Sequence, residues 1–306
     1  MSTATYDAII AGGGIVGAAC ADELARRRLR VAVIERDVIG SGATAAGMGH
    51  IVVMDDSEAQ FALTRYSQQL WRNLRPELPP EVEFEQCGTI WAAADEEEMA
   101  EVRRKEAYYA ARGVPAEAIG AEALERAEPN LRKGMAGGLL VPEDCVVYPP
   151  CAARFLMKRA EKSGAKLYLG HAVSQMENGR VRLDDGTEFS APILVNAAGA
   201  CSPEFTPGVG VNKRKGHLLI TDRYPGFVRH QLVELGYLKS AHSLTNDSVA
   251  FNVQPRRTGQ ILIGSSRQYG VESAEIDTRM LSLMLRRAQE YLPGLAEISS
   301  IRAWTG

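Results

Sequence analysis

The chain has 306 residues, of which 45% are hydrophobic and 24% are charged, and its formal net charge at pH 7 is −3. This composition is typical of a globular protein with one large domain or two smaller ones. A slightly acidic chain lacks the strongly basic surface that nucleic-acid binding requires, so no nucleic-acid partner is expected.

The five cysteines lie far apart, and no two of them form a CxxC pair. An odd number of cysteines in a long chain argues against a disulfide framework and favours a reducing compartment. No run of about 18 apolar residues is present, so no membrane span is expected. The sequence therefore predicts a cytoplasmic protein, and no metal site is expected.

The first predicted elements form one βαβ unit. "YDAIIA" is a short strand, residues 15–29 have helical spacing of apolar positions, and "RVAVIER" at 30–36 is a second strand. Between the first strand and the helix, Gly12, Gly14 and Gly17 fit the pattern GxGxxG.

In this context each glycine has a predicted role. Gly12 allows the tight turn, Gly14 lets a pyrophosphate approach the backbone, and Gly17 lets the helix pack closely on the strand. The helix then begins at Ile15 and Val16, where its free N–H groups attract phosphate. Glu35 lies 23 residues after Gly12, where a carboxylate can accept from a ribose hydroxyl. An acid at this position argues against a 2′-phosphate.

The remaining predicted elements alternate between segments typical of a nucleotide-binding domain and segments typical of an α+β domain. A helix at 57–74, with Asp55, Asp56 and Ser57 as candidate N-caps, is followed by a proline-rich break, an alternating strand and a charged helix. A helix at 151–163, short strands separated by turns, and an apolar, buried-type strand at 192–200 come next. From about 213 the chain shows antiparallel-type strands and a helix near 277–292. The segments of the predicted nucleotide-binding domain are thus interrupted twice by α+β segments, so the two domains are expected to be interleaved in the sequence.

Two further stretches distinguish NAD from FAD. "GSGATAAGMGHI" at 40–51 and "ILVNAAGACS" at 193–202 are rich in small residues, as expected where backbone lies against a flat ring system. A simple NAD dehydrogenase has no need for either stretch, so FAD is the predicted cofactor.

Together with the "GHLLIT" segment and the "QPRRTGQILIGSS" hairpin, this ordered set resembles the FAD-dependent D-amino-acid oxidase superfamily, which includes glycine and sarcosine oxidases. The segment "TAAGMGHIVVMDD" is most similar to the β-subunit type, represented by D-hydroxyproline dehydrogenase, opine oxidase and hydrogen cyanide synthase. Such subunits work beside a second flavin subunit and a small iron–sulfur subunit, and the resemblance implies those partners here.

The resemblance implies an α/β fold of two interleaved domains. A Rossmann-type FAD-binding domain would comprise residues 1–80 and 140–205. An α+β substrate-binding domain with a mixed or antiparallel sheet would comprise residues 81–139 and 206–306.

The resemblance also implies positions for the cofactor. Gly12, Gly14 and Gly17 would hold the pyrophosphate, Glu35 would bind the adenosine ribose, and Arg36 would flank it. The segment with Ala43, Thr44, Gly47 and Met48 would run toward the flavin ring, Val173 would meet the adenine, and Ala198 and Gly199 would lie near the ribityl chain. A plain turn hydroxyl at Thr44 and an ordinary strand residue at Val173 are the alternatives.

The implied reaction is oxidation of the C–N bond of a small secondary or cyclic amino acid, with transfer of hydride from the carbon to flavin N5. D-Hydroxyproline is the favoured substrate. Arg256 is a candidate for binding the substrate carboxylate, although a solvated hairpin charge is the alternative. Asn252 and Gln254 alternate with Val253 and are expected to face the pocket. His50 lies next to the segment predicted to approach the flavin, and it could act in catalysis or support the site through hydrogen bonds. The same two roles are open for His217.

Two other functions remain open: a self-contained glycine- or sarcosine-type oxidase that makes hydrogen peroxide, and a non-catalytic flavin-binding assembly subunit. Members of the resembled family continue beyond the point where this chain ends, at "IRAWTG". The expectation is therefore that the chain is a fragment that binds FAD weakly on its own.

Overall fold

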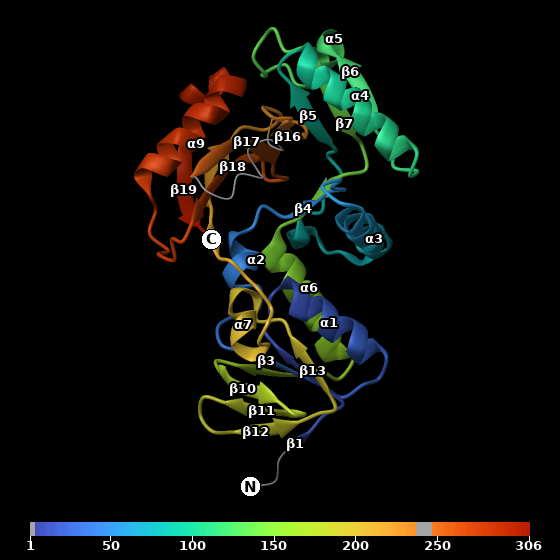
Figure 1. Cartoon of the computed structure of the whole chain (residues 1–306), viewed down its shortest axis with the longest axis vertical. Helices are drawn as coiled ribbons and strands as arrows, with labels where there is room; N and C mark the ends of the chain where they lie inside the picture. The colour runs from blue at the N-terminus through green and yellow to red at the C-terminus, as the bar shows by residue number, and fades with distance from the viewer. Residues whose placement is uncertain (1–3, 237–246) are drawn as a thin grey trace. The chain divides into compact units, whose positions relative to one another are not determined.

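The structure is a computed structural model that describes residues 4–236 and 247–306. The chain forms two compact units, each built from separate stretches of sequence (Figure 1). Unit 1 comprises residues 1–47, 78–82 and 148–213, and unit 2 comprises residues 48–77, 83–147 and 214–306. The structure thus groups residues 48–77 and 140–147 with unit 2, whereas the sequence prediction grouped them with the nucleotide-binding part. Conversely, residues 81–82 and 206–213 belong to unit 1, whereas the prediction placed them in the substrate-binding part.

Unit 1 contains two four-stranded sheets and the helices around them. Its strands are β1 (Ala4–Thr5), β2 (Ala8–Ala11), β3 (Val31–Glu35), β9 (Lys166–Leu169), β10 (Val173–Glu177), β11 (Arg180–Leu183), β12 (Glu188–Ser190) and β13 (Ile193–Asn196). Its helices are α1 (Ile15–Arg26), α2 (Gly42–Ala46), α6 (Pro149–Lys162) and α7 (Ser202–Phe205), with 3₁₀ turns η2 (Pro80–Val82) and η3 (Gly199–Cys201).

The predicted βαβ unit is confirmed as β2–α1–β3. One sheet has the order β13-β2-β3-β9, and all of its pairs are parallel. The residues of β2 and β3 are buried throughout, as expected for central strands of a parallel sheet. Helix α1 packs against α6, and Figure 1 shows the two helices beside this sheet. The carboxyl ends of β2, β3 and β13 therefore meet at one edge.

Two predicted elements of unit 1 are shorter than expected. Helix α1 ends at Arg26 rather than at residue 29, because Arg28 has a left-handed backbone with φ of 65°. Strand β13 ends at Asn196, and it is less buried than predicted, since Ile193 is 42% exposed. Its single strand partner among residues 4–236 and 247–306 is β2, so β13 lies at the edge of the sheet.

Unit 2 is built around one large mixed sheet. Its strands are β4 (His50–Ile51), β5 (Thr89–Ala93), β6 (Glu117–Gly120), β7 (Gly137–Val141), β8 (Cys145–Val146), β14 (Arg214–Lys215), β15 (His217–Arg223), β16 (Gln231–Glu234), β17 (Ser248–Pro255), β18 (Gln260–Tyr269) and β19 (Ser300–Thr305). Its helices are α3 (Glu58–Leu74), α4 (Glu96–Ala110), α5 (Ala121–Ala127) and α9 (Thr278–Tyr291), with 3₁₀ turns η1 (Arg75–Glu77) and η4 (Pro293–Glu297).

The sheet has the order β19-β15-β18-β17-β16-β5-β7-β6, with β14 also paired to β18. The β16–β5 pair is parallel and the other pairs are antiparallel, so the mixed or antiparallel sheet predicted from the sequence is present. One face packs on α9 through a core that includes Leu232, Phe251 and Met284. The other face carries Trp91 and Val233, which pack with residues of α4.

The described part of the chain contains no helix whose length and apolar content would let it cross a membrane.

Candidate functional site

The glycine turn between β2 and α1 is held by close backbone contacts. Gly12 has φ of +107°, and a Cβ added to it would lie 2.3 Å from the carbonyl oxygen of Ala197. A Cβ on Gly17 would lie 1.9 Å from the carbonyl oxygen of Gly12. Both glycines are therefore required by the packing of the protein on itself.

Gly14 differs from its neighbours. A Cβ on Gly14 would meet a single described atom within 4 Å, the Thr44 hydroxyl at 3.1 Å, and its backbone is extended. Gly14 is also the N-cap residue of α1 and provides no side-chain cap. A side chain here would press on the Thr44 hydroxyl but would meet no backbone atom within 4 Å, so the space in front of the helix N-terminus is open to an approaching group.

Thr44 provides the polar contact at this helix end. Its hydroxyl oxygen accepts a hydrogen bond of 3.0 Å from the backbone N–H of Ile15. This contact brings α2 onto the N-terminus of α1. The hydroxyl proton remains free to donate to an anion at the same place.

Glu35 is fixed at the end of β3 by two backbone donors. Its Oε2 accepts from the Gly13 N–H at 2.6 Å, and its Oε1 accepts from the Asp37 N–H at 2.8 Å. The residue is 8% exposed. The carboxylate is thus held against the glycine turn, an arrangement that the sequence pattern did not reveal.

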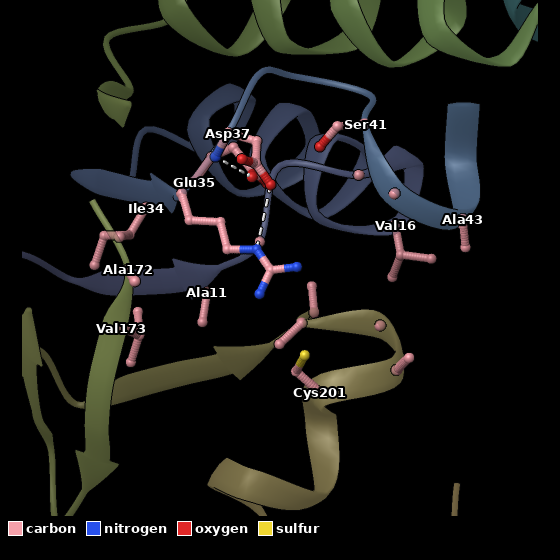
Figure 2. Close-up of a pocket in the computed structure, with 18 of the residues that line it drawn as sticks. Ala11, Val16, Ile34, Glu35, Asp37, Ser41, Ala43, Ala172, Val173 and Cys201 are labelled. Atoms are coloured by element: carbon pink, nitrogen blue, oxygen red, sulfur yellow. Dashed lines mark hydrogen bonds and ion pairs between the residues drawn. The ribbon is translucent and has the colours of Figure 1, made fainter. Parts of the chain in front are cut away.

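These groups line a cavity of about 520 Å³ in unit 1 (Figure 2). Its walls come from the glycine turn, the β3–α2 segment, residues 171–173 and residues 197–205. Figure 2 shows the labelled side chains of Glu35, Val16, Val173 and Cys201 around it. Most of the predicted cofactor residues line this cavity, namely Gly12, Gly14, Ile15, Val16, Glu35, Arg36, Ala43, Thr44, Val173, Ala198 and Gly199.

Three predicted cofactor residues are not among the residues that line the cavity. Gly17 lies behind the turn, where it contacts Gly12, and Gly47 is the C-cap residue of α2. Met48 belongs to unit 2. Their predicted roles toward the cofactor stay predictions.

Sequence reasoning missed several lining residues, among them His171, Cys201 and Phe205. Arg36 Nε forms an ion pair with Asp37 at 3.2 Å, and Cys201 also lies close enough to raise the pKa of the guanidinium. The small-residue run "NAAGACS" indicated this wall of the cavity without indicating which side chains face it.

Unit 2 contains the residues predicted to act on the substrate. Gln254 donates from Nε2 to the Met48 carbonyl at 3.0 Å, and its side chain lies beside the His50 ring. Burial lowers the pKa of His50 to about 4, so the ring is uncharged at neutral pH. Asn252 is 6% exposed, and its Oδ1 has no hydrogen-bond partner among the described residues. The structure thus brings His50 and Gln254 together, and Asn252 lies two residues along the same strand.

Arg256 and His217 have partners of their own. The Arg256 guanidinium donates to both carboxylate oxygens of Glu83, at 2.9 and 2.8 Å, and its side chain is 12% exposed rather than solvated. Its predicted role in binding a substrate carboxylate stays a prediction. His217 uses both ring nitrogens, because Nδ1 bonds the Ser266 hydroxyl at 2.8 Å and Nε2 accepts from the Asp277 N–H at 3.0 Å. Both ring nitrogens of His217 thus have hydrogen-bond partners within unit 2, and its role stays a prediction.

The sequence of the whole chain is similar to those of known oxidases and related subunits. The chain is 28% identical over 320 residues to glycine oxidase of Geobacillus kaustophilus, an alignment that covers 99% of this chain and 81% of that protein. It is 26% identical to hydrogen cyanide synthase subunit HcnC of Pseudomonas aeruginosa, covering 99% of this chain and 81% of that protein.

The crystal structure of glycine oxidase from Geobacillus kaustophilus superposes with a TM-score of 0.86 at 25% identity, covering 99% of this chain and 82% of that chain. This likeness confirms the predicted α/β fold. Residues 7–306 match the family described as FAD dependent oxidoreductase (DAO), and the chain therefore belongs to this family of FAD-dependent enzymes.

Proposed function

We propose that the unit 1 cavity binds the adenosine and pyrophosphate part of FAD and that the enzyme oxidises the C–N bond of a secondary or cyclic amino acid. D-Hydroxyproline is the favoured substrate. The observation that carries the proposal is the open position at Gly14, which lies between the N-terminus of α1 and the fixed carboxylate of Glu35.

The residues of the cavity fit the chemistry of this part of FAD. The α1 N-terminus and the Thr44 hydroxyl offer donors to a pyrophosphate, and the extended backbone at Gly14 lets it approach. The Glu35 carboxylate accepts hydrogen bonds from hydroxyl groups and carries a negative charge that opposes an additional phosphate. The segment from Ala43 to Met48 and residues 198–199 remain the proposed path toward the flavin ring.

FAD supplies the acceptor for a hydride taken from the substrate carbon. The protein must bind the amino acid, orient its C–H bond and accept the proton that the ammonium group loses before oxidation. In unit 2, the uncharged His50 ring adds no positive charge that would oppose an ammonium group at neutral pH. Asn252 and Gln254 offer hydrogen-bonding groups from the same strand.

An amino-acid substrate is supported by the relatives, since glycine oxidase is among them. The preference for a secondary or cyclic amine is supported by the resemblance of the segment 44–56 to the β-subunit type. Hydrogen cyanide synthase HcnC is itself a subunit, which supports the proposal that this chain works with a second flavin subunit and a small iron–sulfur subunit.

The test is the absorption spectrum of the FAD-loaded protein before and after anaerobic addition of single amino acids. The panel would contain D- and L-hydroxyproline, D- and L-proline, sarcosine and glycine. We expect the flavin band to bleach with D-hydroxyproline and more slowly or not at all with glycine. Bleaching by dithionite but by no amino acid would overturn the proposal and favour a non-catalytic flavin subunit.

A self-contained oxidase is the second candidate, and glycine oxidase as a relative favours it. The two candidates are distinguished by reducing the protein with its substrate and then mixing it with air. Rapid reoxidation with stoichiometric hydrogen peroxide would identify an oxidase, whereas slow reoxidation would identify a dehydrogenase that passes electrons to a partner subunit.

A further inference from the structure

One face of helix α3 in unit 2 is apolar and exposed. Leu63, Tyr66 and Leu70 are 69%, 61% and 49% exposed, and Ala59 before them is exposed as well. The opposite face carries Phe61, which is buried in a core shared with residues of α4. Large apolar side chains that lie together on a surface mark a contact with another molecule, because their burial is favourable.

The spacing of these residues matches a coiled-coil seam. Ala59, Leu63, Tyr66 and Leu70 follow one another at intervals of four, three and four residues, which are the intervals of the a and d positions of a heptad. They form a stripe along one side of α3 that extends over most of its 17 residues. This face is therefore suited to receive another helix.

The positions that flank the seam carry no charge. They are Gln60, Ala62, Ser67, Gln69 and Leu74. In a coiled coil these e and g positions select the partner through their charges. Uncharged flanks present no like charge to a copy of the same helix, so self-pairing meets no repulsion beside the seam.

The charges farther from the seam decide the direction of such a pair. Glu58 is the first residue of α3 and Arg72 lies in its last turn, and their side chains are 72% and 39% exposed. Parallel copies would place each of these charges beside its own like. Antiparallel copies place Glu58 of each beside Arg72 of the other and also oppose the two helix dipoles. Arg65 meets its own copy near the centre, so two attractive pairs stand against one repulsive pair.

Both side chains keep groups for a further partner. Glu58 accepts hydrogen bonds through Oε1, and its Oε2 has no partner within residues 4–236 and 247–306. Arg72 donates to Glu143 from one terminal nitrogen and to Gln68 from the other. A guanidinium has five N–H donors, so donors remain for a carboxylate of a second copy.

We propose that α3 pairs in antiparallel orientation with α3 of a second copy of this chain, about a two-fold axis. In this register Ala59 packs against Leu70 of the second copy, and Leu63 packs against Tyr66 of the second copy. The two-fold axis repeats both layers. Each layer joins a smaller side chain to a larger one, which lets the two faces interdigitate. The same patch serves both copies, as in most dimers with two-fold symmetry.

Four layers form a small interface. A helix of this length spans about 25 Å at the usual rise per residue. One such helix pair buries less surface than the roughly 800 Å² per partner of a standard stable interface. We therefore expect a reversible monomer–dimer equilibrium rather than a permanent dimer. The inference is independent of the proposed function.

The test is sedimentation velocity of the complete protein over a range of concentrations. The wild type should change from monomer to dimer as its concentration rises. Leu63→Glu and Tyr66→Lys should each weaken the dimer at least about tenfold, because each would bury two unpaired charges per dimer. Both side chains are exposed in the single chain, so the melting temperature measured at low concentration should stay unchanged.

A mixture of the two variants tests the orientation. In a mixed antiparallel pair, the introduced carboxylate of one variant faces the introduced ammonium of the other, and the second Leu63–Tyr66 layer is the wild-type layer. The mixture should therefore dimerise at least about fivefold more tightly than either variant alone. A parallel pair would place the two introduced charges in different layers and would give no such gain.

Leu283→Glu is the matched control. Leu283 is a leucine of α9 in the same unit, it is 38% exposed, and it lies outside the stripe. This variant should dimerise like the wild type. A wild type that stays monomeric at every concentration, a Leu63→Glu variant that dimerises like the wild type, or a mixture that gains nothing would each overturn the proposal.

Discussion

The Oε2 atom of Glu35 accepts a hydrogen bond of 2.6 Å from the backbone N–H of Gly13. This bond ties the end of the second strand of the βαβ unit to the middle of the glycine turn. The carboxylate is therefore oriented before any cofactor arrives, and a ligand that uses it need not order a flexible side chain. Such preorganisation favours tight binding.

We expect Glu35→Gln to weaken FAD binding. The variant keeps the shape of the side chain but loses its charge, and its amide group would place a donor against one of the two backbone N–H groups. Loss of a hydrogen bond to a charged group costs about 1.5–3 kcal/mol, which corresponds to an affinity roughly ten- to a hundredfold lower. Quenching of flavin fluorescence in a titration measures the change.

The control for this variant is Glu23→Gln. Glu23 lies on α1 and accepts a hydrogen bond from Arg27 at the surface. The control substitution therefore removes one carboxylate from the same region without changing the cavity. An affinity in Glu35→Gln equal to that of the control would show that Glu35 does not contact the cofactor.

Gly14 and Gly17 are expected to respond differently to substitution. Gly17→Ala would force a Cβ to 1.9 Å from the Gly12 carbonyl oxygen and should destabilise the fold by about 1–3 kcal/mol or more, as overpacking does. Gly14→Val should retain most of the fold, because its Cβ presses only on the Thr44 hydroxyl among the described atoms, but should lose FAD. Thermal unfolding and the flavin content of the purified variants measure the two effects. Full flavin content in Gly14→Val would contradict the proposed pyrophosphate position.

Thr44→Val tests the contact at the start of α1. The variant removes the acceptor of the Ile15 N–H, a loss of about 1 kcal/mol by analogy with helix caps. It should also lower FAD affinity, because the hydroxyl that would donate to the pyrophosphate is gone. Thr44→Ser keeps the hydroxyl and should restore most of the affinity. Equal affinities in the two variants would mean that Thr44 acts only as a turn residue.

Stability should fall as the pH rises from about 4 to about 7, the range between the unfolded and the folded pKa of Asp144. Burial raises the pKa of Asp144 from 3.8 to about 7, so between these values the folded state binds more protons than the unfolded state. By linkage, this residue's contribution to the free energy of unfolding then decreases with rising pH. Asp144→Asn should thus gain stability relative to the wild type between pH 4 and pH 8. A constant difference in melting temperature across this range would contradict the raised pKa.

The local part of the site was predictable from the sequence, and the long-range part was not. Gly12, Gly14, Gly17 and Glu35 fall within one βαβ unit, where the spacing of glycines and the end of a strand determine their positions. In contrast, the bond between Arg256 and Glu83 joins residues that are 173 positions apart. Nothing in the local pattern at either position indicates its partner.

The neighbouring positions of the buried side chains of Thr89, Gln231 and Gln254 in the unit 2 sheet depend on strand register. Thr89 and Gln231 become neighbours because β5 and β16 pair in parallel, although 142 positions separate them in the sequence. A shift of one residue in either strand would place one of these side chains on the opposite face. The sequence showed isolated polar residues in apolar strands, and only the paired sheet shows that they form a line.

The most direct test of the account is a crystal structure of the protein with FAD bound. The account predicts the pyrophosphate against the backbone of Gly14 at the N-terminus of α1, with the adenosine ribose hydroxyls within hydrogen-bond distance of the Glu35 carboxylate. FAD bound elsewhere, with the unit 1 cavity filled only by solvent, would contradict it.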